Sequence, residues 1–255
     1  MSQTRPLALV TGPTSGIGRA FALELARRGY DLVLVARSEQ PLAEVATAVR
    51  DLGAEAEVLV ADLGERESLA QVERRLADQD RPVDLLVNNA GFGLKRGLAD
   101  NDVEDEQRML DVLVTAVMRL SHAATVAMLA RGHGGIINVS SVAGFLPRGT
   151  YGAAKAYVTR LSQWADATYR GRGVRTMALC PGFVRTDFHQ RMEVGQDSAP
   201  SWMWLDADRL VSTALADFDK GKALSVPDPR YKAVVALASY VPTGVLGRLQ
   251  GLGRK

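Results

Sequence analysis

The chain has 255 residues, a formal net charge of +2, 47% hydrophobic residues and 24% charged residues. This composition is that of an ordinary soluble globular protein, and it gives no basis for binding nucleic acid. The single cysteine, Cys180, excludes an internal disulfide and a cysteine-based metal cluster. The polar start does not resemble a signal peptide, and no apolar run reaches the roughly 20 residues of a membrane span. We therefore expect a cytoplasmic protein.

Short apolar runs alternate with longer amphipathic stretches along most of the chain. The runs that predict buried strands are residues 7–10, 32–35, 58–61, 85–87, 136–139 and 177–179. Helical periodicity covers residues 19–28, 42–52, 69–78, 103–130 and 151–170. Nearly continuous hydrophobic strands separated by helices indicate a parallel sheet covered on both faces. The pattern predicts an α/β fold, a Rossmann-like doubly wound parallel sheet in a single domain.

The last third of the chain is less regular. Residues 187–205 contain Gly195, Pro200 and many polar residues, so we expect a loop or short helices there. Residues 206–219 predict a helix, and residues 223–226 a last strand. Residues 229–255 form an apolar tail with basic residues between the apolar ones. Three interpretations of this tail stay open: packing on the domain, packing across a dimer, and a helix on a membrane surface. No linker interrupts the chain, so we predict one domain over 1–255 with a core over 5–226.

A glycine-rich turn follows the first predicted strand. Residues 11–18 read TGPTSGIG and lead directly into a predicted helix. Glycines at such a junction let the backbone turn tightly and approach a pyrophosphate. The helix N-terminus then offers free N–H groups and a partial positive charge. In this strand–turn–helix context the segment predicts a nucleotide-binding loop.

Tyr151 and Lys155 are four residues apart on a predicted helix, so their side chains project from the same face. A lysine ammonium near a tyrosine stabilises the phenolate, whose parent phenol has a pKa of about 10. The pair predicts a general acid or base adjusted toward neutral pH. Taken alone, an ordinary amphipathic helix explains the same spacing.

Further motifs appear in a fixed order around these two. Asn88-Asn89-Ala90-Gly91 follows the fourth predicted strand, Ser141 the fifth, and Pro181-Gly182 the sixth. With residues 11–18 and the Tyr151/Lys155 pair, these motifs resemble those of the classical short-chain dehydrogenases/reductases, in particular an NADP-preferring bacterial branch. The resemblance covers about residues 5–226. It implies an NADP(H)-dependent oxidoreductase that transfers a hydride between the nicotinamide and a carbonyl or secondary alcohol. It also implies a homo-oligomer, a dimer or tetramer, formed through the helices that start near Val103 and Tyr151.

The resemblance implies a role for each catalytic residue. Tyr151 exchanges a proton with the substrate oxygen, and Ser141 binds and polarises that oxygen. Lys155 binds the nicotinamide ribose and lowers the pKa of Tyr151. We favour Ser141 over the adjacent Ser140 because Val142-Ala143-Gly144 follows it, as in the family.

The end of the second predicted strand indicates which cofactor binds. A carboxylate at this point would favour NAD, but the chain has Arg37, whose planar guanidinium suits a 2′-phosphate. We therefore predict NADP, with a solvated surface arginine as the alternative. By resemblance, Asp62 bonds the adenine amino group and Thr186 the nicotinamide carboxamide. The complete predicted cofactor set is Gly12, Thr14, Ser15, Gly16, Ile17, Gly18, Arg37, Asp62, Leu63, Asn89, Ala90, Gly91, Tyr151, Lys155, Pro181, Gly182, Val184 and Thr186.

The chain departs from the family at Leu113. Related proteins carry an asparagine there, in a stretch like Asp-Val-Asn-Val-Thr, thought to hold a water near the lysine. Leucine can neither donate nor accept a hydrogen bond. Three interpretations stay open: a blunted proton supply, a water that reaches Lys155 from another backbone carbonyl, and a simple core residue. The same departure supports the rival function, a non-catalytic or weakly active NADP-binding protein.

Large apolar side chains gather in the motifs that border the nicotinamide. They are Phe92, Phe145, Leu146, Phe183, Met192, Trp202, Met203 and Trp204. They predict a pocket for a lipophilic ketone or aldehyde, and packing beneath a substrate lid over 187–205 is the alternative. Among the remaining candidates, we expect His122 to be packed, His133 to be exposed and Cys180 to be buried, whereas His189 lies in the lid region. No group of histidine, cysteine and carboxylate residues has metal-ligand spacing.

Overall fold

Seven parallel strands form one sheet in the computed structural model, which describes residues 5–185 and 201–240. The strands are β1 Leu7–Thr11, β2 Asp31–Ala36, β3 Ala56–Val60, β4 Leu85–Asn88, β5 Gly134–Val139, β6 Val174–Leu179 and β7 Leu224–Ser225. Their spatial order is β3-β2-β1-β4-β5-β6-β7, and every pairing is parallel. The order reverses between β1 and β4, which is where ligands bind in open α/β sheets. The predicted doubly wound fold is confirmed.

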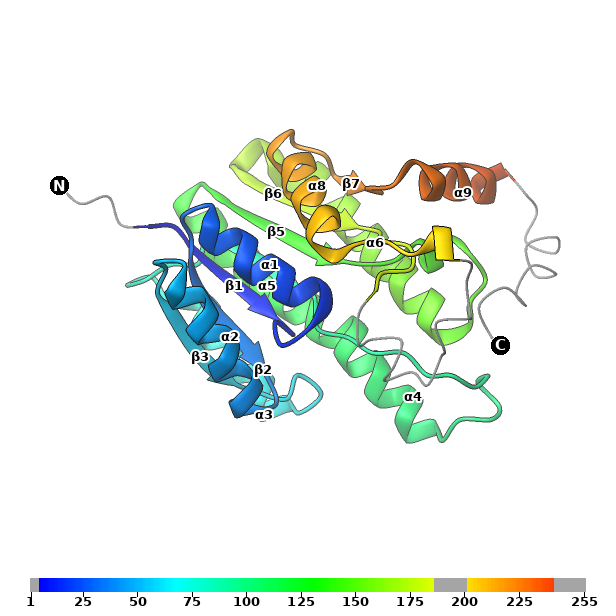
Figure 1. Ribbon diagram of the computed structural model, residues 1–255, viewed down its shortest axis with the longest axis horizontal. Coiled ribbons are helices and arrows are strands. Elements are labelled where there is room, and N and C mark those ends of the chain that lie inside the picture. The colour runs from blue at the N-terminus through cyan, green and yellow to red at the C-terminus, as the bar shows by residue number, and fades with distance from the viewer. Residues whose placement is uncertain (1–4, 186–200, 241–255) are drawn as a thin grey trace.

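Helices cover both faces of this sheet (Figure 1). They are α1 Gly16–Arg27, α2 Glu39–Asp51, α3 Arg66–Ala77, α4 Val103–Leu110, α5 Val117–Arg131, α6 Gly149–Tyr169, α8 Ala207–Asp219 and α9 Pro229–Tyr240. On one face α1, α2 and α8 build the larger core, and on the other α3 and α5 build a second core. Successive strand residues alternate between the two, so Ala8 belongs to the first core and Leu9 to the second. Because α4 follows β4 and α9 follows β7, both helices extend on the side where the strands end.

The long helix expected over residues 103–130 is interrupted. A π-helical turn, Asp111–Ala116, separates α4 from α5 and contains Leu113. Such turns occur frequently at functional sites. By length and composition alone, Val103–Arg131 is apolar enough to cross a membrane, whereas we had expected no such segment. In this fold Leu120, Ala124 and Met128 of α5 pack in the second core.

The last third of the chain contains regular elements in residues 201–240. A 3₁₀ turn spans Ser201–Met203, and the predicted helix and last strand are present as α8 and β7. The tail begins with α9, whose Tyr231 and Val235 pack on the larger core. For this part of the tail, packing on the domain is therefore the correct interpretation. Residues 186–200 and 241–255 lie outside the described residues, and with them most of the predicted lid.

Asp217 fastens the short edge strand β7 to α8. Its carboxylate accepts hydrogen bonds from Lys222 Nζ at 2.5 Å and from Ser225 Oγ at 2.7 Å. Burial alone would raise the pKa of Asp217, but the hydrogen bonds from Lys222 and Ser225 outweigh it and lower the pKa. The folded state therefore favours the charged carboxylate.

We predict that Asp217→Asn lowers the free energy of unfolding by about 1–3 kcal/mol at pH 7, because two charge-assisted hydrogen bonds weaken. A carboxylate with a lowered folded pKa contributes its stability above the unfolded value of about 3.9. That contribution decreases as the pH falls toward the folded pKa, so the difference between the two proteins should be smaller at pH 3 than at pH 7. Urea unfolding at both pH values measures this. Asp219→Asn, at an exposed ion pair with Arg28, is the control and should change little. A loss of equal size at both pH values would contradict the assignment.

Candidate active site

The glycine-rich turn after β1 forms a cradle that side chains would fill. Gly12 has a φ of +65°, a region that favours glycine. A Cβ on Gly18 would lie 2.1 Å from the Gly12 carbonyl oxygen, so no other residue fits at position 18. Helix α1 starts at Gly16 directly behind this turn, and its first N–H groups have no partner within the helix. The turn thus fits a phosphate group of a dinucleotide.

Asn89 and Thr11 tie this turn to the end of β4. The Asn89 side chain donates to the carbonyl oxygens of Thr11 at 2.9 Å and of Gly12 at 3.0 Å. In return Thr11 Oγ1 accepts from the backbone N–H groups of Asn89 at 2.9 Å and Ala90 at 3.0 Å. In this structure Asn89 therefore supports the phosphate turn as well as bordering it.

Asn88 belongs to a buried polar network rather than to a surface turn. Its amide donates to Ser121 Oγ at 3.1 Å and to Asn138 Oδ1 at 2.9 Å. Asn138 in turn donates to Ser162 Oγ of α6 at 2.9 Å. The network joins β4 and β5 to α5 and α6, so this asparagine has a structural role.

Two predicted adenosine-side residues lie at neighbouring strand ends. Arg37 is exposed directly after β2, and Asp62 follows β3. One oxygen of Asp62 accepts from the Gly64 N–H at 2.9 Å, and the other pairs with Arg108 of α4 at 3.2 Å. Sequence reasoning missed Arg108, because nothing local relates it to a carboxylate 46 residues away.

Ser141 and Tyr151 meet although the loop between them is short. Ser141 precedes the 3₁₀ turn Val142–Phe145 and accepts from the Ala143 N–H at 3.1 Å. Its side chain also forms a hydrogen bond with Tyr151. The hydroxyl of Ser140 instead donates to the Lys155 carbonyl at 2.7 Å and contacts Thr159. The preference for Ser141 over Ser140 agrees with this geometry.

Burial dominates the electrostatics of Tyr151 and Lys155. Burial raises the pKa of Tyr151 to about 12, and the hydrogen bond with Ser141 opposes this only in part. Burial also lowers the pKa of Lys155 to about 8. The ammonium of Lys155 donates to the Val139 carbonyl at 2.8 Å and lies 5.7 Å from the centre of the Tyr151 ring. The expected lowering of the Tyr151 pKa by Lys155 is thus wrong for this structure. At neutral pH the phenol keeps its proton and the lysine keeps its charge.

Leu113 lies in the wall of this site. It is 1% exposed and forms an apolar cluster with Met109 and Ala154, against which Phe92 and Tyr151 pack. A Cβ built on Gly91 would lie 2.7 Å from Leu113 Cδ2 and 3.9 Å from Lys155 Nζ. Leu113 and Lys155 thus both lie close to Gly91, and Lys155 bonds a backbone carbonyl directly. Leu113 is a core residue here, and its effect on proton supply is a separate question.

The loop after β6 runs beside the turn that follows Ser141. The Pro181 carbonyl accepts from the Val142 N–H at 3.0 Å, and Val184 pairs with Leu205 as an isolated parallel bridge. The predicted residue Pro181 thus lies beside the turn that follows Ser141, and Gly182 and Val184 lie on the same loop. Thr186 lies outside the described residues.

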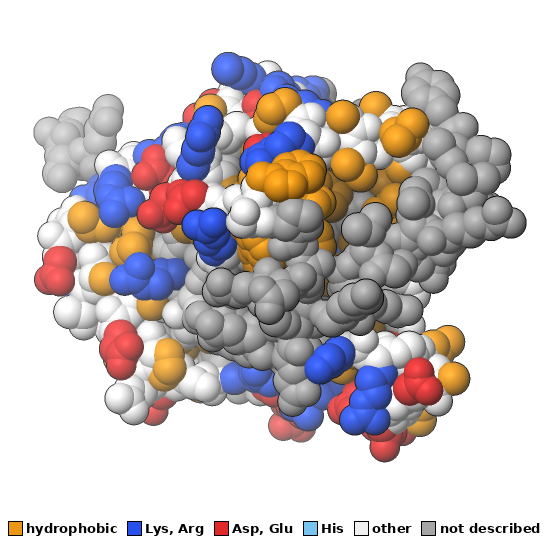
Figure 2. All heavy atoms as spheres, turned by 45° about the vertical axis from the view of Figure 1, so that its right-hand side comes forward, with side chains coloured by type: hydrophobic (Ala, Val, Ile, Leu, Met, Phe, Trp, Pro, Cys, Tyr) orange, Lys and Arg blue, Asp and Glu red, His pale blue; other side chains and the backbone are white. Residues whose placement is uncertain are grey.

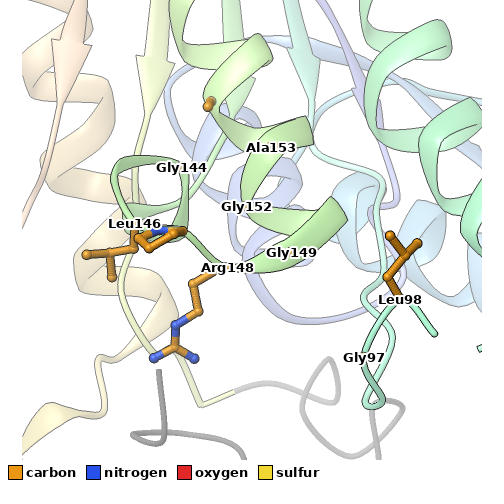
Figure 3. Close-up of a pocket in the computed structure, with 10 residues that line it drawn as sticks. Gly97, Leu98, Gly144, Leu146, Arg148, Gly149, Gly152 and Ala153 are labelled. Atoms are coloured by element: carbon orange, nitrogen blue, oxygen red, sulfur yellow. The ribbon is translucent and has the colours of Figure 1, made fainter. Parts of the chain in front are cut away.

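The predicted apolar residues take several different places in the described part of the chain. Phe92 packs near Tyr151, and Trp202 is exposed. The rings of Phe183 and Trp204 are in tilted contact, with centres 5.6 Å apart and an interplanar angle of 50°. A hollow of about 510 Å³ lies beside the start of α6, with Leu146 and Arg148 on one side and Leu98 on the other (Figure 3). Of the predicted set only Leu146 lines it. Met192 lies outside the described residues.

The side chains that we excluded from catalysis behave as follows. Cys180 is buried, and burial raises the pKa of its thiol to about 11, so it is unreactive at neutral pH. His133 is exposed, as expected, but His122 is also exposed on α5, where we expected packing. His189 lies outside the described residues. Residues 5–185 and 201–240 contain no cluster of side chains that could hold a metal ion.

The fold and site together define a class, the nicotinamide-dependent oxidoreductases built on a Rossmann-like sheet. A sequence model described as short chain dehydrogenase matches residues 6–197, and the chain belongs to this family. The predicted family is confirmed.

Several characterised relatives match most of the chain. Galactitol 2-dehydrogenase from Rhizobium johnstonii is 32% identical over 249 residues, which cover 95% of this chain and 91% of that protein. A short-chain dehydrogenase from Sphingobium yanoikuyae, solved in complex with NADPH, is 35% identical with a TM-score of 0.84, covering 93% of this chain and 96% of that one. The bulky-bulky ketone specific alcohol dehydrogenase from Comamonas testosteroni is 32% identical with a TM-score of 0.79, covering 93% and 95%.

These similarities establish the general activity. The protein is an oxidoreductase of the dehydrogenase/reductase type that binds a nicotinamide cofactor and acts on alcohols or ketones.

We predict that Leu113→Asn raises turnover with the nicotinamide cofactor, because an amide can hold a water beside Lys155 where leucine holds none. The same change should lower the free energy of unfolding by about 1–3 kcal/mol, since it places a polar group in an apolar cluster. Steady-state kinetics and urea unfolding measure the two effects. Leu113→Ala is the control, because it loosens the packing without adding a polar group. Unchanged turnover in Leu113→Asn would show that Leu113 has no influence on proton supply.

Proposed function

We propose that the protein is an NADPH-dependent carbonyl reductase for lipophilic ketones or aldehydes, reversible as an alcohol dehydrogenase. The observation that carries this proposal is the hydrogen bond between Ser141 and Tyr151, with the buried Lys155 behind them at the ends of the strands. We propose a cytoplasmic setting and a homo-oligomer as well. Exposed apolar side chains on α5 and α6 support the oligomer, namely Met118, Val126, Tyr157 and Trp164.

The chain's own residues supply the acid and the electrostatics. When bound, the reduced nicotinamide supplies the hydride for the carbonyl carbon. Tyr151 is protonated at neutral pH and gives its proton to the carbonyl oxygen, so the C=O group becomes an alcohol. Ser141 binds the same oxygen by hydrogen bond as negative charge develops on it. Lys155 is charged below a pKa of about 8, and its ammonium stabilises the phenolate that remains.

The preference for NADPH rests on Arg37. Its side chain is exposed immediately after β2, and the following Ser38 and Glu39 begin α2. An arginine there offers a planar donor fork to a 2′-phosphate, whereas the carboxylate that would bind a 2′-hydroxyl is absent from the end of β2 in the described chain. The NADPH complex of the Sphingobium yanoikuyae relative supports the same choice.

The preference for lipophilic substrates rests on the aromatic side chains near the site. Phe92 packs beside Tyr151, and the Phe183 ring, on the loop that contains Pro181, is in tilted contact with the ring of Trp204. Aromatic and apolar linings suit substrates with large apolar groups. The ketone specificity in the name of the Comamonas testosteroni relative supports this substrate class.

Tyr151→Phe tests the reaction directly. We expect it to reduce NADPH oxidation across a panel of aryl and long-chain ketones and aldehydes by about 10²–10⁴-fold, because the general acid is lost. NADPH binding, followed by its fluorescence, should persist. Tyr157→Phe, an exposed tyrosine on the same helix, is the control. A wild-type protein that binds NADPH but reduces no substrate would instead favour a non-catalytic NADP-binding protein.

Arg37→Ala tests the cofactor preference. We expect the ratio of kcat/KM for NADPH to that for NADH to fall about 10–100-fold, because a charge-assisted hydrogen bond is worth about 1.5–3 kcal/mol. Arg74→Ala removes another exposed arginine, on α3, and should leave the ratio unchanged. An unchanged ratio in Arg37→Ala would mean that Arg37 is only a solvated surface residue.

A further inference from the structure

Tyr231 at the start of α9 is buried against the loop that follows β6. It is 3% exposed. A Cβ built on Gly182 would lie 2.0 Å from Cζ of the Tyr231 ring and nearly as close to its neighbouring carbons. The ring thus occupies the space where a side chain at position 182 would stand. Position 182 requires glycine because of a residue almost fifty positions later.

The hydroxyl of Tyr231 connects two separate backbone segments. It accepts a hydrogen bond from the Phe183 N–H at 3.0 Å and donates one to the Met203 carbonyl at 2.8 Å. Burial raises the pKa of Tyr231, so the hydroxyl stays protonated and can donate at physiological pH. A phenylalanine at this position would keep the ring on Gly182 but would leave both backbone groups without this partner.

The segments that Tyr231 connects also hold each other. The Leu205 N–H donates to the Phe183 carbonyl at 2.8 Å, and the Arg185 N–H donates to the Leu205 carbonyl at 3.0 Å. On its other side, the same loop accepts a hydrogen bond at Pro181 from Val142, the residue after Ser141. The Gly182–Phe183 backbone is therefore fixed between the turn of the catalytic serine and the ring of Tyr231.

The start of α9 is itself well anchored. Arg230 pairs with Asp228 at 2.7 Å, bonds the Trp202 carbonyl and lies over the Trp202 ring at 6.0 Å. Figure 2 shows hydrophobic and basic side chains side by side on the upper part of this face. The start of α9 is therefore held in place by contacts with residues 201–205, and Tyr231 projects from this fixed position toward Gly182.

We propose that Tyr231 is a positioning residue of the cofactor site, which sets the Gly182–Phe183 backbone against the nicotinamide end of the dinucleotide. This inference rests on the proposed function, since it assumes NADPH in the site. The family model matches residues 6–197, so Tyr231 lies outside the segment that this model matches. α9 then belongs to the active-site architecture rather than to a dispensable tail.

Tyr231→Phe tests the proposal with two ligands. NADPH reaches both ends of the site, whereas 2′,5′-ADP carries only the adenosine half. We expect the Kd of NADPH to rise about tenfold, as for the loss of one hydrogen-bonding partner of two buried backbone groups. The Kd of 2′,5′-ADP should stay unchanged, and the KM for NADPH should rise more than kcat falls. Tyr157→Phe is the matched control and should change neither Kd.

The outcomes separate this proposal from its premise. If Tyr231→Phe binds NADPH like the wild type, or weakens both ligands equally, the positioning role is overturned. If the wild type oxidises NADPH with none of the ketones and aldehydes of the panel, the proposed function fails instead. Hydrogen exchange on the wild type gives a check that needs no variant. The Phe183 amide should be protected in the free protein, and rapid exchange there would overturn the contact.

Discussion

The site depends on how closely the ends of β1 and β4 are held together. These strands are neighbours at the point where the strand order reverses, and the backbone has to turn away from the sheet in both directions there. Thr11 and Asn89 join the two ends with four hydrogen bonds. The same packing brings Gly18 against the Gly12 carbonyl, which leaves no space for a side chain. The turn that fits a phosphate therefore depends on glycines, which have no side chain, at the point where the two strands and α1 meet. Ser141 and Pro181 follow the next strands, β5 and β6, and so lie at the same carboxyl edge of the parallel sheet.

Exclusion of water shapes the chemistry at this edge. Burial moves the pKa of Tyr151 upward and the pKa of Lys155 downward, since each shift favours the neutral form. A tyrosine that keeps its proton is suited to donate it, which supports the proposed reduction. The pKa of Lys155, about 8, lies only slightly above neutral pH. The charge with which Lys155 stabilises the phenolate therefore depends on how far the site is shielded from water. Leu113 contributes to that shielding, because its apolar cluster includes Tyr151 itself. An apolar side chain at position 113 thus keeps the surroundings of Tyr151 apolar, and charges interact more strongly in such surroundings.

Local sequence was sufficient for the features that depend on neighbours along the chain. Apolar runs and helical periods predicted the alternating strands and helices, and the glycine spacing of residues 11–18 predicted the turn before α1. Features that depend on distant residues were not predictable in this way. The π-helical turn keeps the apolar pattern of an ordinary helix, so nothing in residues 111–116 distinguishes it. The pairing of Arg108 with Asp62 and the contact of Tyr231 with Gly182 require the fold to be known. The pKa of Tyr151 was misjudged for the same reason, because a helix pair shows the lysine but not the depth of burial.

The two ends of the chain contribute to the site in different ways. Residues up to β6 supply the parts that transfer of a hydride and a proton needs, and these are also the parts that the family model recognises. Residues 201–240 supply side chains that support the site from outside: the Trp204 ring contacts the Phe183 ring, and Tyr231 fills the space next to Gly182. A catalytic group holds its geometry only as well as the residues packed behind it. Because a Cβ at Gly182 and the ring of Tyr231 cannot occupy the same volume, the glycine of the loop after β6 and the tyrosine of α9 constrain each other. In such an arrangement the C-terminal region can change its outer surface freely, but not the few side chains that face the loop after β6.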